Sequence, residues 1–326
     1  MGLRATRFLP VVTLFVLAPM IGELLSGSSP PAEFFNPVAF LLLASLYGSG
    51  AIVVRELRVG WNKDFRAILL LGAAYGIIEE GLMVKSFFDP NWMDLGILGS
   101  FGRWAGVNWV WAEMLTTYHA VFSTAIPIVL VELAYPERRD ERWTGDRSFK
   151  CFVALLVVVT AIGFFFLTPY VPPLPQYLLT IVATILFVYI AYRLPTQNGG
   201  SMVRNVGKAR SLFVAGLGST ALFFLIYWVG PYVFNHPIIV MILGIALVFG
   251  MLRLLKDFDW RGHASSLDRL AIVSGALFFL IIITPLQEFG ADRTDNPAGM
   301  TLVGVAAVAG LLLLRYKIKR VYVSNG

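Results

Sequence analysis

Three glutamates and one histidine lie inside apolar stretches of this sequence, where a charge is costly. Glu79 and Glu80 are adjacent, and Glu113 and His119 belong to the next apolar stretch. An ionised carboxylate near the centre of a bilayer costs about 2.5–3.5 kcal/mol on insertion scales. Two adjacent carboxylates also repel each other, which favours a proton or a cation on at least one of them. These residue types predict proton binding, cation binding or general-base chemistry inside a membrane.

The spacing of two glycines predicts what the acidic pair faces. Gly72, Gly76 and Glu80 recur at every fourth position and therefore share one face of a helix. Small residues on that face let a second helix approach closely and bring its side chains to Glu80. Counted from Arg66 at the inner surface, the acidic pair lies about 20 Å deep, in the outer third of the membrane.

The following stretch descends from the outer side and carries the histidine. Glu113 lies about 9 Å below its start, and His119 lies about 18 Å below it. Thr116, His119 and Ser123 are spaced as one polar stripe on a helix face. An ascending helix and its descending neighbour can therefore bring the acidic pair and His119 together.

These residues form one candidate site. The residues that we expect to be catalytic or proton-binding are Glu79, Glu80, Glu113 and His119. The candidate ligands for a divalent metal such as zinc, which binds carboxylate and imidazole, are Glu79, Glu80 and His119. The alternative for the acidic pair is solvation at the outer rim, and for the histidine it is a hydrogen-bonded structural role.

Charged residues near the ends of the stretches have simpler interpretations. Glu23 ends the first stretch, and we expect it to cap that helix rather than to join the site. Arg55, Glu56 and Glu132 lie at inner ends and are interpreted as interfacial. The mixed-charge run 137–142 is interpreted as a solvated helix end.

The segment Ser86–Gly106 mixes aromatic residues with glycines. Such a mixture predicts an interfacial or partly re-entrant segment over the site, with a plain aromatic belt as the alternative. Arg103 in this segment is expected to pair with Asp89, Asp94 or a glutamate of the site.

The acidic pair on one helix and a histidine on the next resemble the CPBP family of intramembrane proteases, the CAAX-processing and bacteriocin-processing group. The family pattern is EExxxR, then FxxxH, then a later histidine with an asparagine. Glu79 and Glu80 match the acidic pair, and His119 matches the first histidine in spacing. The resemblance implies that one of the two glutamates activates water for peptide hydrolysis beside His119, with or without a metal.

Other positions of that pattern differ in this sequence. Val84 stands at the arginine position, with Lys85 one place further on, and Leu115 stands at the phenylalanine position. The candidates for the last motif are Asn235 and His236, in a short turn and in a different order. The resemblance covers the acidic pair and the first histidine.

The amino-acid composition indicates that the protein folds in a lipid bilayer. Of 326 residues 57% are apolar and 14% are charged, against about 25% charged in soluble domains. The sequence predicts an all-α, polytopic transmembrane bundle, one domain over residues 1–326, since a spanning helix needs about 20 apolar residues. The ten expected spans are Arg7–Leu25, Pro37–Val54, Arg66–Phe88, Val107–Tyr135, Phe152–Thr168, Gln176–Tyr192, Ser211–Phe234, Pro237–Leu252, Leu270–Leu286 and Pro297–Leu314.

The distribution of positive charge predicts the orientation. With the N-terminus inside, Lys85, Arg103 and Arg293 are the outer members of the 26 Lys and Arg residues. Inner loops carry the excess of positive charge in membrane proteins, so both termini are expected in the cytoplasm and the protein in the cell membrane. The same rule accounts for the net charge of +6 and speaks against a nucleic-acid partner. We expect the first helix to be retained rather than cleaved, and Cys151 to be inert packing.

The two parts of the chain differ in polarity. Residues 1–135 hold the polar site, whereas residues 150–316 read as an apolar scaffold without charges away from the helix ends. Three functions stay open: an intramembrane peptide hydrolase, a proton- or cation-coupled carrier of small solutes, and a scaffold protein without chemistry. The expected partners are membrane lipid and an unidentified peptide or solute.

Overall fold

The structure, a computed structural model, describes residues 2–93, 95–196, 209–255, 266–290, 293 and 295–324. Over this part of the chain it is an all-α bundle, which confirms the predicted fold class, with a two-stranded hairpin of β1 (Arg103–Trp104) and β2 (Val107–Asn108). Nine helices of the described chain are long and apolar enough to cross a membrane. The predicted number of ten and the predicted orientation stay predictions.

The nine membrane-length helices correspond to nine of the expected stretches. In chain order they are α1 (Gly2–Pro19) with η1 (Met20–Leu25); α3 (Pro37–Leu43), η2 (Ala44–Gly48) and α4 (Ser49–Gly60); α6 (Trp109–Tyr118), η5 (His119–Ala125) and α7 (Ile126–Ala134); α8 (Asp146–Phe166); α9 (Leu174–Arg193); α10 (Ala209–Phe224), η7 (Leu225–Val229) and α11 (Gly230–Val233); α12 (Pro237–Leu255); α13 (Ser266–Phe289); and α14 (Met300–Ser324). The short elements are α2 (Pro31–Phe34), η4 (Gly96–Gly99) and η6 (Pro136–Arg138).

The helix that carries the acidic pair is α5 (Phe65–Ile77) continued by η3 (Ile78–Met83). It is not among the nine, and it holds Arg66, Glu79 and Glu80. The helix ends before the predicted boundary at Phe88, because Lys85 adopts a left-handed backbone conformation with φ of 62°. The Lys85 ammonium then donates to the carbonyl oxygens of Phe164 (2.7 Å) and Thr168 (3.0 Å) at the end of α8.

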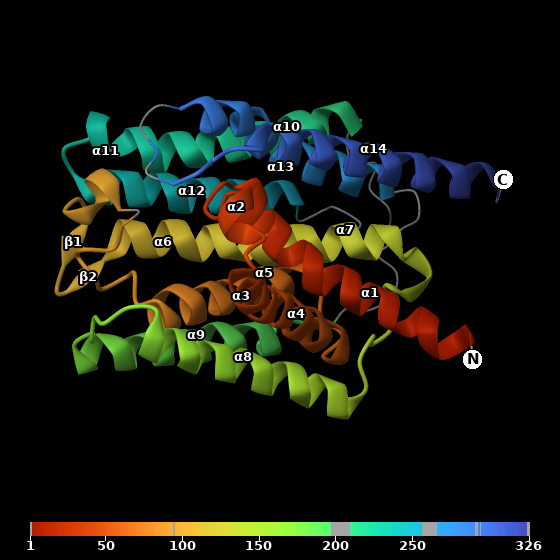
Figure 1. The fold of residues 1–326 in the computed structure, drawn as a ribbon, viewed down its shortest axis with the longest axis horizontal. Helices are drawn as coiled ribbons and strands as arrows, with labels where there is room; N and C mark the ends of the chain where they lie inside the picture. The colour runs from red at the N-terminus through yellow and green to blue at the C-terminus, as the bar shows by residue number, and fades with distance from the viewer. Residues whose placement is uncertain are drawn as a thin grey trace.

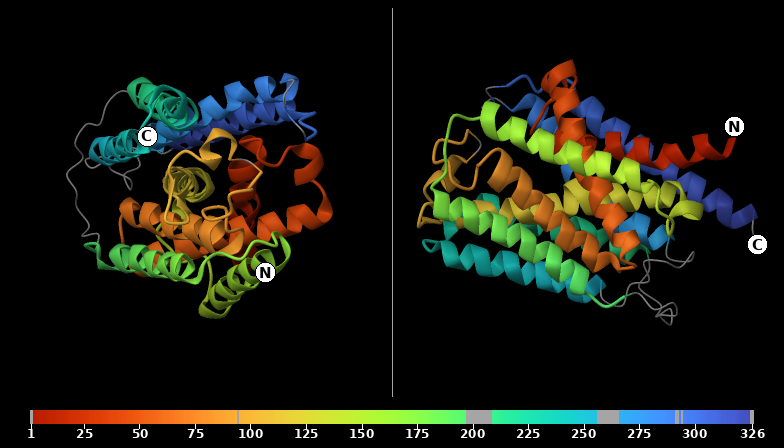
Figure 2. Two further views of the ribbon diagram at one scale, coloured as in Figure 1. Left: turned by 90° about the vertical axis from the view of Figure 1, so that its left-hand side faces the viewer. Right: turned by 90° about the horizontal axis from the view of Figure 1, so that it is seen from below.

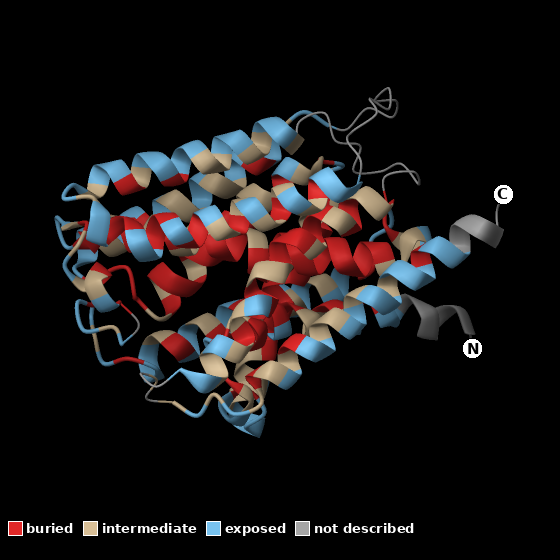
Figure 3. Cartoon of the chain, turned by 90° about the horizontal axis from the view of Figure 1, so that it is seen from above, coloured by how far each residue is buried: buried red, intermediate tan, exposed pale blue. Residues whose placement is uncertain are grey.

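The continuous helix α6–η5–α7 lies at the centre of the bundle (Figures 1 and 2). Its membrane-length window is 78% buried, against 11% for α9, α12 and α14. Helices α8 and α9 pack against α4 and α5 on one side, and α10 to α14 lie on the other side. Figure 3 shows the same arrangement as a buried centre within exposed outer helices. The apolar second part of the sequence therefore flanks the polar part on both sides.

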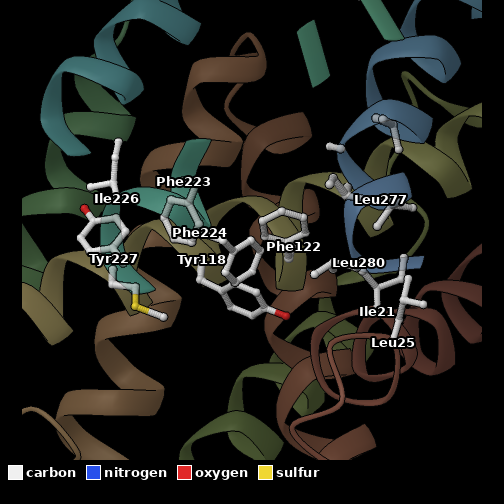
Figure 4. Close-up of a cluster of buried hydrophobic side chains, with 14 of the residues drawn as sticks. Ile21, Leu25, Tyr118, Phe122, Phe223, Phe224, Ile226, Tyr227, Leu277 and Leu280 are labelled. Carbon is white, nitrogen blue, oxygen red and sulfur yellow. The ribbon is translucent and has the colours of Figure 1, made fainter. Parts of the chain in front are cut away.

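Aromatic side chains join the central helix to the later helices (Figure 4). Tyr118 stacks on Phe122 with ring centroids 5.0 Å apart, and Phe122 contacts Phe224 of α10 at 6.5 Å. Leu277 and Leu280 of α13 complete this buried cluster. Burial of large apolar side chains thus fixes the central helix against the α10–α13 side.

Five helices of the described chain contain a π-helical segment, named η1, η2, η3, η5 and η7 above. Such segments shift the regular hydrogen bonds, and inside a membrane every polar backbone group needs a partner. Side chains provide several of these partners. The carbonyl oxygen of Gly22 accepts from Tyr118 (2.8 Å), that of Leu82 from Tyr177 (3.1 Å), and that of Ala120 from Thr124 (2.7 Å).

A charged network is buried where α4, α7 and the segment 136–144 meet. Arg55 bonds Glu56 at 2.7 Å, and its guanidinium lies 3.7 Å from the ring centre of Trp143. The Arg55 Nε and an Arg58 Nη1 lie 3.7 and 3.6 Å from one oxygen of Glu132. Arg55, Glu56 and Glu132 are all at least 96% buried within the protein, and their expected position at the membrane interface stays a prediction.

The segment 136–144 is attached to that network by its backbone. Arg55 donates to the carbonyl oxygens of Arg138 (3.2 Å) and Arg139 (2.8 Å). The amides of Trp143 and Thr144 donate to Glu56 at 3.0 and 3.2 Å. A loop whose sequence predicts a solvated helix end is therefore held by buried charges.

At the opposite end, the segment Ser86–Gly106 packs against the bundle. Phe87 and Phe88 are buried in the core, and Trp104 stacks on Trp109 at 5.3 Å. Arg103 donates to the carbonyl oxygens of Phe88 (2.7 Å) and Gly99 (3.1 Å). The expected pairing of Arg103 with a glutamate of the site does not form, and Asp94 lies outside the described residues.

Candidate functional site

The structure brings Glu79, Glu80 and His119 together in the middle of the bundle. The Nδ1 atom of His119 lies 3.2 Å from an oxygen of Glu79, and its Nε2 atom lies 3.0 Å from an oxygen of Glu80. All three residues are buried. The imidazole ring thus stands between two carboxylates, with one nitrogen facing each. We call these three residues the triad.

Close helix packing makes this contact. A Cβ atom built on Gly72 would lie 2.2 Å from Oγ1 of Thr124, and one built on Gly76 would lie 2.8 Å from Cβ of His119. The glycine face predicted from the sequence is therefore the surface on which α5 meets η5. Without the two glycines, the acidic pair could not reach His119 at hydrogen-bond distance.

A set of polar side chains supports the triad. The Ser86 hydroxyl donates to the second oxygen of Glu80, and the Trp111 indole donates to Ser86 at 3.0 Å. Ser123 lies 2.9 Å from Nδ1 of His119. These contacts link the triad to the segment 86–106 through Ser86, because that residue begins the segment.

Tyrosine rings surround the histidine on its remaining sides. The rings of Tyr47, Tyr75 and Tyr118 lie 6.0, 6.1 and 5.5 Å from the imidazole of His119. Tyr47 also donates a hydrogen bond to Glu23. Ser29 donates to the other oxygen of Glu23 at 2.7 Å. The expected capping role of Glu23 is wrong, since its carboxylate turns inward to Tyr47 at the edge of the triad.

The structure does not bring Glu113 to the triad. Its carboxylate accepts a hydrogen bond from Tyr227 of η7 at 2.9 Å, and it lies against Gly244 of α12. Six positions separate Glu113 from His119, which places the two side chains on different faces of one helix. Glu113 instead lines a groove between the α5–α9 side and the α10–α12 side.

That groove has a volume of about 830 Å³ and is almost entirely apolar. It extends from Phe65 at the start of α5 to Trp109 and Gln176 at the starts of α6 and α9, so it follows the length of the bundle. Glu113 is the one acidic residue among the described residues of its wall. Thr116 and Ala120, which flank His119 on α6 and η5, also line it, whereas no member of the triad does.

Every π-helical segment of the described chain carries a polar residue that either belongs to the triad and its surroundings or contacts Glu113. The residues are Glu23 in η1, Tyr47 in η2, Glu79 and Glu80 in η3, His119 and Ser123 in η5, and Tyr227 in η7. π-Helical turns occur frequently at functional sites. In this chain they coincide with the buried polar side chains of the triad and its surroundings and with Tyr227, the partner of Glu113.

The remaining positions of the CPBP pattern do not reach the triad. Lys85 bonds the end of α8, and Leu115 packs against the apolar core. Asn235 and His236 are exposed in the turn before α12. The site in this structure therefore contains the acidic pair and the first histidine, without the histidine and asparagine of the last motif.

The residue types of the triad suit a divalent metal, but the arrangement of their side chains suits it less well. One ligand atom from each residue lies within 4.8 Å of the others, and zinc binds imidazole and carboxylate. A metal ion takes one nitrogen of an imidazole, yet the two nitrogens of His119 face different carboxylates. Bringing both carboxylates to one nitrogen requires a side-chain rotation. Without any rotation, the present arrangement suits protons shared between His119 and the two carboxylates. The bound metal stays a prediction.

Several members of the site could not be found from residue type and spacing. Tyr47, Tyr75 and Tyr227 read as ordinary aromatic residues of apolar helices, and Ser86 reads as part of a loop. Glu23 offered a signal, because it is an acid that the sequence predicts on the same side of the membrane as the acidic pair. Its contact with Tyr47 depends on how η1 and η2 pack, which the sequence does not show.

These features define a multi-pass membrane protein with a buried polar site. The model of an uncharacterized membrane protein family matches residues 12–319, and the chain belongs to that family. No curated protein and no solved structure matches the chain. The family assignment supports a membrane protein and does not support the CPBP resemblance.

Proposed function

We propose that this chain is a proton-coupled carrier of the membrane in which Glu79, His119 and Glu80 bind the coupling proton. The observation that carries the proposal is the position of the His119 ring, which has one carboxylate oxygen at each nitrogen. A neutral imidazole has a single N–H donor. Two facing carboxylates therefore favour an additional proton, either on the ring or on a carboxyl group.

The surroundings of the ring suggest how the triad responds when that proton leaves. Ser123 lies 2.9 Å from Nδ1, so its hydroxyl can donate to a deprotonated nitrogen. The facing oxygen of Glu79 has no hydrogen bond within the described structure. When the proton leaves, this oxygen would lose its electrostatic attraction to the imidazolium 3.2 Å away. Deprotonation thus weakens the attraction of Glu79 to His119, across the contact between η3 and η5.

The groove supplies a route for the carried molecule beside that contact. Ala73 and Ile77 of α5 and Thr116 and Ala120 of the central helix line it, directly next to the residues of the triad. A change in the packing of α5 against η5 therefore changes the groove wall. The apolar lining favours an apolar or amphiphilic solute. Arg66 and Glu113 are the charged residues of the described wall, and Glu113 is the one that would attract a cationic group on that solute.

A peptide hydrolase of the CPBP kind is the second candidate. It is favoured by Glu80, whose two oxygens are held by His119 and Ser86 in the manner of an oriented general base. The exposure of Asn235 and His236 and the absence of the triad from the groove wall weigh against it. For these reasons the carrier is preferred.

The experiment compares E79Q, E80Q and H119N with wild-type protein in proteoliposomes. A fluorescent lipophilic cation serves as the transport probe, and an imposed pH gradient supplies the driving force. A carrier that uses the triad requires a charge change at Glu80. E80Q should therefore lose gradient-driven uptake while still exchanging probe across the membrane without a gradient.

Peptide cleavage is measured on the same proteins. Loss of cleavage in E80Q, with no gradient-driven uptake by wild type, would replace the carrier by the hydrolase. E113Q serves as the comparison, since Glu113 lies in the groove and outside the triad. Full activity of all three triad variants in an assay that wild type passes would make the triad structural, and the chain a scaffold.

A further inference from the structure

A second cavity lies at the inner end of the bundle, between α10, α13 and α14. Its volume is about 400 Å³, and Arg210, Arg315 and Lys319 line it. The remaining wall is mainly apolar, with Phe213, Phe278 and similar side chains. Three cations and an apolar wall therefore share one cavity, on the side that the sequence predicts to be cytoplasmic.

None of these three cations has an anionic partner in the described structure. No hydrogen bond or ion pair is formed by Arg210, Arg315 or Lys319, and all three are exposed at the mouth of the cavity. Asp268 is the one acid at this end of the three helices among the described residues. It does not line the cavity and does not pair with them. Among the described residues, the cavity wall therefore carries a positive charge that no acid balances.

The cavity persists because α14 is fixed on its opposite face. Lys317 donates to the carbonyl oxygen of Ala134 at 2.6 Å and lies 5.2 Å from the ring centre of Tyr135. Ile318 is buried beside it. These contacts hold the end of α14 against α7. Arg315 and Lys319 are left to face α10 and α13.

We propose that this cavity binds an anionic phospholipid of the adjoining leaflet. The phosphate group would lie among Arg210, Arg315 and Lys319, and an acyl chain would follow the apolar wall toward the exposed Leu312. Basic cavities between membrane helices on the cytoplasmic side bind anionic lipid headgroups. The apolar wall argues for a lipid over a free phosphate ion, which would use the cations alone. This site is independent of the triad and of the proposed transport.

The test titrates purified protein in detergent with phosphatidylglycerol and with phosphatidylcholine of the same acyl chains, and counts retained lipid by native mass spectrometry. Wild type should retain phosphatidylglycerol more tightly than phosphatidylcholine. Each of R210Q, R315Q and K319Q should weaken phosphatidylglycerol binding by about fivefold, the effect of one cation near a lipid surface.

The matched control is the triple variant R147Q/K150Q/R253Q, which removes three exposed cations of the same end that do not line the cavity. It should bind as wild type does, while R210Q/R315Q/K319Q should lose the preference. A271F fills the apolar wall without changing charge and should also weaken binding. Melting curves identify any variant that fails to fold. If a triple variant fails to fold, the binding of phosphatidylglycerol by the single variants R210Q, R315Q and K319Q provides the test.

Three results would overturn the proposal. The first is equal binding of the two lipids by wild type. The second is equal loss in the cavity and control triple variants. The third is displacement of phosphatidylglycerol by an equal concentration of inorganic phosphate, which would identify an anion site without a lipid requirement.

Discussion

Gly76 and His119 are in direct contact across the interface of α5 and η5, with 2.8 Å between a Cβ atom built on the glycine and the Cβ of the histidine. Non-bonded carbon atoms in proteins do not approach each other so closely. Glycine is therefore required at this position for the backbones to come near enough. The distance of 3.0 Å between His119 and Glu80 depends on that approach.

We expect G76A to separate the two helices. The added methyl group should destabilise the protein by about 1–3 kcal/mol, the usual cost of overpacking. A lower melting temperature in scanning fluorimetry would report it. The matched control is G218A in α10, where nothing lies within 4 Å of the built Cβ. Alanine there should be neutral or stabilise by up to about 1 kcal/mol, so equal melting temperatures for both variants would contradict the packing argument.

The buried network of Arg55, Glu56, Arg58 and Glu132 should be sensitive to the loss of one charge. E132Q leaves Arg55 and Arg58 without the carboxylate that lies 3.7 and 3.6 Å away. Breaking a buried ion pair by removing one partner costs about 3–5 kcal/mol. We therefore expect a large fall in melting temperature.

The control for that network is an exposed pair at the same end. Arg142 and Asp146 lie 2.8 Å apart, and the Asp146 side chain is 84% exposed. Surface pairs contribute about 0–1 kcal/mol. D146N should therefore melt close to wild type. If E132Q lowers the melting temperature no more than D146N does, the network does not stabilise the fold.

The orientation predicted from the positive charges can be tested with single cysteines. In a C151S background, W104C places a thiol on the exposed hairpin and R147C places one at the start of α8. An impermeant maleimide should label W104C in intact cells, and R147C only after permeabilisation. The opposite pattern would invert the orientation and move the lipid cavity to the outer leaflet.

The close approach of α5 to the histidine-bearing helix was accessible from sequence, because the two glycines that permit it are spaced regularly along an α-helix. Gly72 and Gly76 mark a close-packed face, and adjacent spans run in opposite directions. The position of Glu113 was not accessible. Depth alone favoured its joining the triad, whereas its side chain points to Tyr227 on a helix more than a hundred residues later.

The burial of the inner charges was also beyond sequence reasoning. Positive charge at the ends of spans indicates the side of the membrane on which a loop lies, but not whether its side chains meet water. Arg55 is covered because Trp143 and the backbone of the 136–144 segment fold over it. Such coverage depends on contacts between distant parts of the chain.

The π-helical segments have a consequence for how this site can vary between related chains. A π-helical turn contains one residue more than an α-helical turn, so it is equivalent to a single-residue insertion within a helix. Deleting Ile78 at the start of η3 would restore regular α-helix and rotate the residues that follow it, Glu79 and Glu80 included, by about 100° relative to α5. Glu79 and Glu80 would then leave His119 without any change in their own identity. A relative that keeps all three residues but differs in length within η3 or η5 would therefore not form the same site.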